Sequence, residues 1–312
     1  MVAGASGNLP DLLRLRLLLE LSRVGTMAEV ARRTGYGTSA VSKHLAVLEQ
    51  EVGVRLLTPA GRRVQLTPAG ERLAEHAVGI LARVEQAAAE LCGESEPVGR
   101  VRLASFFTAM EPVVLPALVR LRAEFPRVEA EVSEHEPEQT VELVLAGDSD
   151  LGVVYDYSLV PRELPPGLSA RPVDEQPLYL AVPAGHPDAG CPAALADLRA
   201  LADSGWIANS RGTDDDELVQ RVCAMAGFVP RIAHRVDSLH LVNSLTGAGL
   251  GVALLAESGI ERHRTDVAFR RLDPLAGVRR SSVIARRGRW SWPPVAAVAR
   301  ALLAAGTADP PG

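Results

Sequence analysis

The sequence predicts a multidomain chain: an all-α-rich module with a β-hairpin wing, then a long helix, then an α/β domain of two lobes. The chain has 312 residues, which is too many for one ordinary hydrophobic core. Helical and hairpin patterns occupy residues 11–66, whereas strand and helix patterns alternate from residue 98 to residue 255. A polar, helix-breaking segment at 93–97 separates the two regions.

The composition is that of a globular protein, with 47% hydrophobic and 23% charged residues. No apolar run reaches the roughly 18–20 residues that span a bilayer. The first twenty residues mix arginines into the leucines, a pattern that does not predict a signal peptide. Cys92, Cys191 and Cys223 are widely spaced and form no CxxC pair. We therefore expect a cytoplasmic, reduced protein with no membrane partner.

Charge is distributed unevenly along the chain. The net charge of -5 argues weakly against a nucleic-acid partner, because such proteins usually carry a basic surface. Residues 1–70, however, contain nine basic and five acidic residues, which gives +4 there and leaves -9 for the rest. The asymmetry makes the N-terminal end the candidate for an anionic partner.

Three helices are expected over residues 11–24, 27–34 and 38–52, with a tight turn at 35–37. In the third helix the apolar residues repeat at steps of four, three and four and form one buried stripe: Val41, Leu45, Leu48 and Val52. The opposite face carries small polar and basic side chains. This arrangement is typical of a helix-turn-helix motif, in which the second helix binds in the DNA major groove with such an outer face.

A two-stranded hairpin is expected next, with strands at 54–57 and 62–66 around a turn at 58–61. Arg62 and Arg63 would lie near its tip, where guanidinium groups can contact phosphates or enter a minor groove. The alternative is that both arginines belong to a merely solvated turn.

Thr67 and Pro68 begin a long helix, since threonine is a good N-cap and proline suits the first helical position. Its apolar residues follow a repeat of about 3.5 residues, which predicts pairing with a second helix as a short coiled coil: Leu73, Ala77, Ile80, Val84, Ala87 and Leu91. The alternative is that this helix packs only on its own domain.

Beyond residue 97 the pattern alternates between strands and helices. Strands are expected at 98–104, 128–132, 151–154, 178–182, 206–208, 232–236 and 252–255, and helices at 113–124, 138–146, 217–226, 239–248 and 293–305. Such alternation implies mostly parallel sheets covered by helices. About 200 residues of it are enough for two lobes with a cleft between them.

Two sets of segments resemble the LysR-type transcription regulators. The first is GTMAEVARRTGYGTSAVSKHLAVLEQEVGVRLLTPAGRRVQLTPAGERL at 25–73, which has the order and spacing of the family's winged helix-turn-helix. The second is looser: VLPALVRLRAEFPRVEAEV, LVLAGDSDLGVV, PLYLAVPAGHP and LVNSLTGAGLGVALL. These segments are similar to the family's sensor domain, which has the two-lobed α/β fold of type II periplasmic binding proteins.

The resemblance implies a DNA-binding domain at 9–66, a linker and dimerisation helix at 67–92, and an effector-binding domain at 98–305 with its second lobe at about 172–270. It further implies a homodimer through residues 67–91, a homotetramer built from two such dimers, and a response to a small-molecule effector. Four residues depart from the family pattern: Gly37 for serine, Leu57 for phenylalanine, Pro59 for a basic residue and Ala256 for proline. Gly37 and Pro59 could weaken or re-aim DNA contacts.

The candidate DNA contacts lie on the outer face of the third helix and in the wing: Thr38, Ser39, Ser42, Lys43, His44, Arg62 and Arg63. Lys43 can donate to guanine, and short hydroxyls fit either base type. The alternatives are a solvated side chain for Ser42, a phosphate contact for Lys43 and a packing role for His44. A dimer would read an interrupted inverted repeat in double-stranded DNA.

The candidate effector contacts lie at the ends of strands and at helix N-termini: Ser105, Phe106, Thr108, Asn209, Arg211, Thr213 and Ser238. Backbone N–H groups and hydroxyls at such places suit a carboxylate or another small anion. The alternatives are pairing of Arg211 with the acidic run 214–216 and a core role for Phe106.

The competing function is an enzyme or a small-molecule-binding protein with the same kind of two-lobed fold. No GxSxG nucleophile motif is present, and GAGLGVAL at 247–254 precedes a strand, opposite to the order of a dinucleotide-binding loop. His234 and His240 lack a supporting ligand pattern for a metal. A transport-associated binding protein would have no use for residues 11–91, and a molybdate-responsive regulator would have an all-β sensor. We expect no catalytic residue, no metal and no cofactor.

Overall fold

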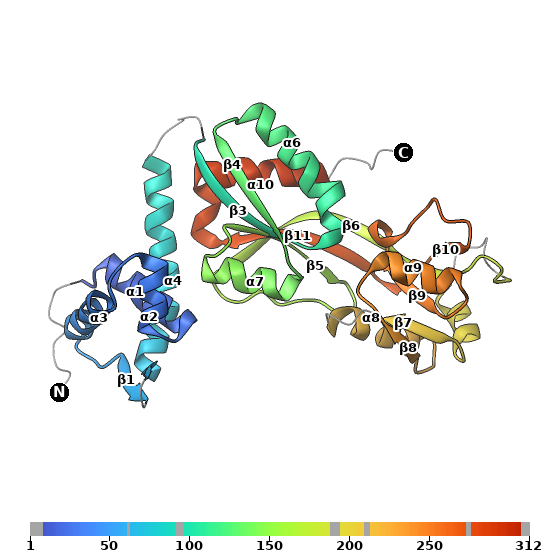
Figure 1. Cartoon of the computed structure of the whole chain (residues 1–312), viewed down its shortest axis with the longest axis horizontal. Helices are drawn as coiled ribbons and strands as arrows, with labels where there is room; N and C mark the ends of the chain where they lie inside the picture. The colour runs from blue at the N-terminus through green and yellow to red at the C-terminus, as the bar shows by residue number, and fades with distance from the viewer. Residues whose placement is uncertain are drawn as a thin grey trace.

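The computed structural model describes residues 9–60, 63–91, 97–187, 194–208, 213–272 and 276–306. The N-terminal module is built from three helices, a hairpin and a long helix: α1 (Leu12–Val24), α2 (Met27–Thr34), α3 (Thr38–Val52), β1 (Leu57–Ala60), β2 (Arg63–Leu66) and α4 (Pro68–Leu91). Figure 1 shows α4 standing between the module and the rest of the molecule.

The three expected helices of the module are confirmed, and their ends follow from local chemistry. The Asp11 carboxylate accepts from two backbone N–H groups at the start of α1, and the Thr26 hydroxyl accepts from the backbone N–H of Glu29 at the start of α2. Each helix ends at a glycine with positive φ. Leucines of α1 pack on the predicted stripe of α3, of which Val41, Leu45 and Leu48 are fully buried.

The start of α3 lacks a side-chain cap, because Gly37 occupies the N-cap position. Substituting Gly37→Ser is expected to stabilise the protein by roughly 0.5–1 kcal/mol, since serine caps a free N–H and restricts the unfolded chain. A Cβ at position 37 would meet only Ser39 Oγ at 3.9 Å, and a φ of -73° suits any residue. Urea unfolding measures the change. The control is Gly53→Ser at a φ of +71°, which is expected to destabilise; a destabilised Gly37→Ser would contradict the argument.

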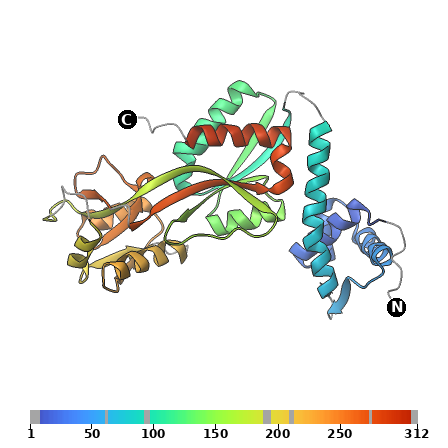
Figure 2. The same ribbon diagram turned by 180° about the vertical axis from the view of Figure 1, so that it is seen from behind.

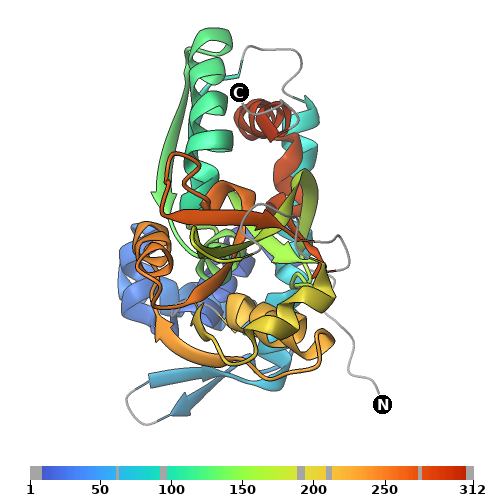
Figure 3. The ribbon, with the colours of Figure 1, turned by 90° about the vertical axis from the view of Figure 1, so that its right-hand side faces the viewer.

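The wing is a hairpin, but its first strand lies later than the sequence pattern indicated. Residues 58–60 belong to β1 instead of a turn, with Pro59 opposite Val64 and Leu57 opposite Leu66. Proline is tolerated there because β1 and β2 form a two-stranded sheet, in which each strand is an edge strand. Figure 3 shows the hairpin projecting at the end of the molecule opposite α6 and α10.

The C-terminal domain contains one nine-stranded sheet, formed by β3 (Gly99–Ser105), β4 (Val128–Glu134), β5 (Leu151–Tyr157), β6 (Leu168–Pro183), β7 (Gly205–Ala208), β8 (Arg231–Arg235), β9 (Val252–Ala256), β10 (Val267–Arg271) and β11 (Val278–Arg286). Its α-helices are α5 (Phe107–Ala109), α6 (Leu115–Glu124), α7 (Pro137–Ala146), α8 (Thr213–Met225), α9 (Leu239–Gly247) and α10 (Pro293–Gly306). A π-helical turn, Met110–Val114, joins α5 to α6.

The two lobes that the sequence predicts are present, and one continuous sheet runs through both. Strand order is β4-β3-β5-β11-β6-β9-β7-β8, with β10 also paired to β6. One hydrophobic core lies between the β3 end of the sheet and helices α6 and α10, and another lies between the β9 end and α8. Figure 2 shows β6 and β11 running side by side from one lobe into the other.

The expectation of mostly parallel strands is wrong for the middle of the sheet. Strand β11 is antiparallel to both β5 and β6, and β6 is antiparallel to β9 and β10. Only the two outer groups, β4-β3-β5 and β9-β7-β8, are parallel. The sequence pattern did not predict β10, β11 or the first half of β6, because these strands have no long helix between them to mark a parallel crossover.

Candidate functional site

The outer face of α3 presents the polar side chains that the sequence selected. Thr38, Ser39, Ser42 and Lys43 are all exposed, while the buried stripe of the same helix faces α1 and α2. His44 is half-buried, and its ring meets that of Tyr36 edge-on with centroids 5.9 Å apart. This contact agrees with the packing alternative for His44. The other four side chains are free to enter a groove.

The structure describes only part of the two wing arginines. Arg63 is the first residue of β2, in register with Ala60, but its side chain lies outside the described residues. Arg62 lies outside them altogether. The hairpin follows α3 directly in the chain, and Glu49 of α3 fixes its start by accepting from the backbone N–H groups of Leu56 and Leu57 at 2.7 and 3.0 Å. The wing and the recognition helix are therefore held as one unit.

A cavity of about 910 Å³ lies between the two lobes. Phe106, Thr108 and Tyr155 line it from the first lobe, and Val236, Ser238 and Leu255 from the second. Small-molecule sites generally measure about 300–1,000 Å³ and combine apolar walls with a few convergent polar groups. This cavity meets both conditions.

The predicted effector residues separate into three groups. Phe106, Thr108 and Ser238 line the cavity. Ser105 is fully buried behind it, with its hydroxyl 3.4 Å from the Phe106 carbonyl. Three further residues cannot be placed in the cavity: the side chain of Thr213, at the start of α8, and the whole of Asn209 and Arg211 lie outside the described residues.

Among the cavity residues that sequence reasoning missed, Arg279 is the most unusual. Arg279 on β11 is 4% exposed and lines the cavity. Its guanidinium donates to three neutral oxygens: Thr108 Oγ1 at 2.9 Å, Gln176 Oε1 at 2.8 Å and Ser258 Oγ at 2.6 Å. Its Nε has no hydrogen-bond partner, and no carboxylate of the described residues forms an ion pair with it. A buried cation in this state strongly favours an anion beside it.

Aromatic rings surround this arginine. Its guanidinium carbon lies 5.2 Å from the ring centre of Phe106 and 5.3 Å from that of Tyr155. Burial, and after it the Asp215 carboxylate, raise the pKa of the Tyr155 and Tyr157 phenols well above the ordinary value. Both phenols therefore remain neutral, and the Tyr157 hydroxyl donates a hydrogen bond to the Asp215 carboxylate. The cavity can bind an anion by a buried guanidinium and enclose an apolar body between rings.

Cys223, on α8, is fully buried, and desolvation raises its pKa from 9.0 to about 12. Because the thiolate is the reactive species, we expect Cys223 to resist iodoacetamide in the folded protein between pH 7 and 9 and to react readily in urea. Peptide mass spectrometry before and after denaturation measures this difference. Equal labelling in both states would show that the thiol is accessible and its pKa ordinary.

The remaining motifs contribute no chemistry to the described part of the chain. The glycine-rich segment at 247–254 joins the end of α9 to β9 and precedes its strand, as expected. His240 Nδ1 lies 3.0 Å from a Glu261 carboxylate oxygen, and no group of three or more potential metal ligands occurs among the described residues. No helix in this part of the chain is long and apolar enough to cross a bilayer.

The structure is thus a helix-turn-helix module with a wing, joined by a long helix to a two-lobed domain with a small-molecule cavity. A family model described as the LysR substrate binding domain matches residues 94–307, and one described as the lysR-family bacterial regulatory helix-turn-helix protein matches residues 12–71. The chain belongs to the LysR family. It is a DNA-binding transcription regulator with an effector-binding domain.

Known relatives agree over most of the chain. The regulator XapR of Escherichia coli K12 is 28% identical over 269 residues, covering 84% of this chain and 87% of XapR. The regulator ShiR of Corynebacterium glutamicum is 31% identical over 232 residues, covering 73% and 76%. A full-length OxyR cysteine-to-aspartate variant from Pseudomonas aeruginosa shares the fold, with a TM-score of 0.68 at 19% identity and 95% coverage of each chain.

Proposed function

We propose that this protein is a cytoplasmic regulator that reads an interrupted inverted repeat of double-stranded DNA and responds to a small anion bound between its lobes. The proposed division is a DNA-binding domain at 9–66, a linker helix at 67–92 and an effector domain at 98–305, with the second lobe at about 172–270. The separate hydrophobic cores of the module and of the two lobes support this division. The family consists of transcription regulators, and we propose no catalytic step.

The proposed DNA contacts are those of the recognition helix and wing: Thr38, Ser39, Ser42, Lys43, His44, Arg62 and Arg63. The exposure of the first four along one face of α3 supports base reading there. The arginines of the wing would contact phosphates, which carry affinity but little sequence information.

Dimerisation through α4 is supported by the uneven burial of its apolar stripe. Ala77 is fully buried within its own module, whereas Ile80 and Val84 are each 42% exposed. The first half of the stripe therefore packs locally, and the second half is available to a partner helix. Pairing through α4 would relate two recognition helices by a two-fold axis and place them in adjacent major grooves, and two such dimers would give a homotetramer.

The effector half of the proposal depends on one observation, the buried Arg279 without an anionic partner. A carboxylate or another small anion entering the cavity would complete its coordination. Thr108 already contacts this guanidinium, and Phe106 and Ser238 would line the ligand. Ser105, Asn209, Arg211 and Thr213 remain proposed contributors from the strand ends and helix N-termini around the cleft.

The test is footprinting of the full-length protein on the DNA upstream of its own gene, followed by a thermal-shift screen of small carboxylates, phosphates and sulfonates. We expect protection of an inverted repeat with an unprotected or hypersensitive centre, and a rise in melting temperature with at least one anion. Absence of any sequence-specific protection at low salt would contradict the DNA half. A melting temperature that rises with none of these anions would contradict the effector half.

A further inference from the structure

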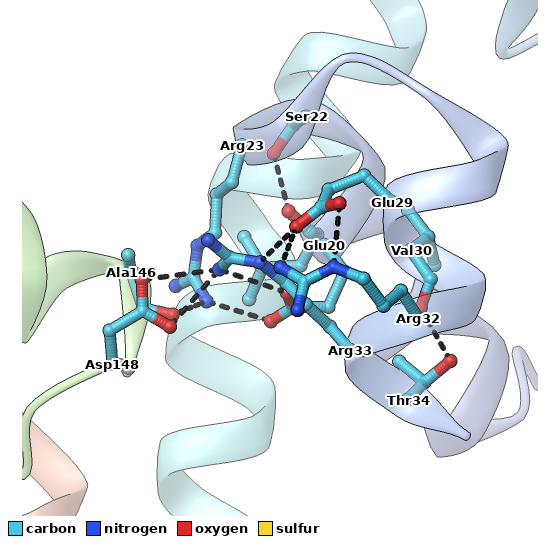
Figure 4. Close-up of polar contacts among 12 residues, drawn as sticks. Glu20, Ser22, Arg23, Glu29, Val30, Arg32, Arg33, Thr34, Ala146 and Asp148 are labelled. Carbon is cyan, nitrogen blue, oxygen red and sulfur yellow. Dashed lines mark hydrogen bonds and ion pairs between the residues drawn. The ribbon is translucent and has the colours of Figure 1, made fainter.

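The DNA-binding module contacts the effector domain of the same chain at one end of α7 (Figure 4). Arg23, in the last turn of α1, donates hydrogen bonds to the backbone carbonyls of Leu145 and Ala146. Arg33, in α2, forms an ion pair with Asp148, in which Nη1 lies 3.0 and 3.1 Å from the two carboxylate oxygens. Two helices of the module thus meet the C-terminal end of α7 and the residue after its C-cap.

Arg23 completes the C-terminal end of α7, which is capped only in part from within its own domain, where Arg286 donates to the Val144 carbonyl. The last turn of α7 contains no basic residue, and its C-cap Gly147 directs its N–H back to carbonyls of the preceding turn. The carbonyls of Leu145 and Ala146 remain as acceptors at the negative end of the helix dipole. Arg23, more than 120 residues earlier in the chain, supplies both bonds. The contact is therefore a helix cap provided by another domain.

The two arginines are held in place on their own side of the interface. The side chains of Arg23 and Glu20 are only 16% and 15% exposed, and Arg23 Nη1 donates to Glu20 at 3.1 Å. Glu20 also lies 3.9 Å from Arg33, and Glu29 lies 3.4 Å from it. The Arg23–Glu20 pair is therefore largely shielded from solvent screening, whereas Arg33 and Asp148, with side chains 30% and 39% exposed, are screened more strongly.

The opposite end of α7 lies at the effector cleft. Glu136, the N-cap of α7, lines the inter-lobe cavity. The helix has 10 residues, so about 15 Å separate its two ends. Its buried face packs closely on β5, where a Cβ at Gly152 would meet Thr140 Cγ2 at 2.5 Å and Val144 Cγ2 at 3.0 Å. One short, rigid element therefore spans the distance from the cleft to the DNA-binding module.

We propose that Arg23 and Arg33 form a latch that fixes the orientation of the DNA-binding module on α7, and that α7 transmits displacements at the cleft to this latch. The α7 latch consists of these two arginines with Leu145, Ala146 and Asp148. This inference rests on the proposed function of the cleft. A ligand that moves the first turn of α7 moves the acceptors of Arg23 with it, and so biases the module between a latched and a released position.

The latch is tested by hydrogen–deuterium exchange of the full-length protein without DNA or ligand. Asp148→Arg places two like charges together and is expected to accelerate exchange roughly fivefold in peptides covering α2 and residues 143–149. The charge swap Arg33→Asp with Asp148→Arg is expected to restore protection. Arg32→Ala is the matched control, because Arg32 lies on the same helix, has a side chain 72% exposed and pairs with Glu29 of its own helix. Wild-type exchange in Asp148→Arg would overturn the latch.

Transmission through α7 is tested with Gly152→Ala, which pushes the helix away from β5 without touching the module. We expect faster exchange in α2 as well as in α7; a change confined to α7 would overturn the transmission. If Gly152→Ala does not fold, Val144→Ile adds one methylene to the same contact and is measured in its place. Because exchange requires neither DNA nor effector, a failed footprint would count against the proposed function alone.

Discussion

Lys43→Ala is expected to weaken binding to the specific DNA site by about tenfold or more. Lys43 is exposed on the outer face of α3, and a good contact to a base edge contributes about 1–3 kcal/mol to discrimination. A dimer loses two such contacts at once, and each 1.4 kcal/mol corresponds to a factor of ten. Fluorescence anisotropy with the footprinted site and with a scrambled site of equal length measures the effect.

The same titrations distinguish a base contact from a phosphate contact. Loss of a base contact lowers affinity for the specific site and leaves the scrambled site little changed. Loss of a phosphate contact lowers both, and reduces the slope of log affinity against log salt by about one per lysine removed. Gln50→Ala is the control, since Gln50 is exposed on α3 near its C-terminal end. Unchanged affinity for both DNAs would remove Lys43 from the interface.

Arg279→Met is expected to abolish the response to anionic ligands, with affinity reduced by about a hundredfold or more. Charge-assisted hydrogen bonds in a desolvated site are among the strongest in proteins, and methionine fills a similar volume without charge. The ligand-free variant is expected to be at least as stable as wild type, because a buried cation without a carboxylate partner is costly to fold. Thermal shift with and without the anion identified by screening measures both effects.

The neighbouring residue provides a matched control. Arg280 follows Arg279 on β11 but points to the other face, is 44% exposed and pairs with Asp156 at 3.0 Å. Arg280→Met should therefore leave anion binding unchanged. If both variants lose binding equally, the effect comes from the strand and not from the buried guanidinium. If Arg279→Met binds anions like wild type, the anion site lies elsewhere in the cleft.

The contrast between these two arginines explains what sequence reasoning could not reach. In the sequence they form one dipeptide before two serines, a composition typical of a loop. Only the pairing of β11 with β6, which sets Arg279 opposite Gln176, shows which of them is buried. Such pairing joins residues about one hundred positions apart and leaves no periodic signal in either segment.

The long strand β6 was missed for a related reason. It contains Pro172 and Pro177, which ordinarily exclude a central strand. The structure accommodates Pro172 beside a shift in register opposite Ser281 and Ser282, where the ladder does not require a donor from every residue. The helices of the module were predictable because their apolar residues repeat within a few turns. The periodicity of apolar residues along the sequence therefore predicted the DNA-binding face. The residues of the cleft depend on strand pairing between distant segments, which the sequence pattern does not reveal.

The position of Lys43 also has a practical consequence, because the chain contains no other lysine. Apart from the chain's α-amino group, the only primary amine lies on the exposed face of the recognition helix. An amine-acylating reagent would therefore modify the unaltered protein at Lys43 and otherwise only at the α-amino group. One reaction removes the positive charge of Lys43 and attaches a reporter group to its side chain. Protection of this amine by bound DNA would measure occupancy directly, without a single substitution in the chain.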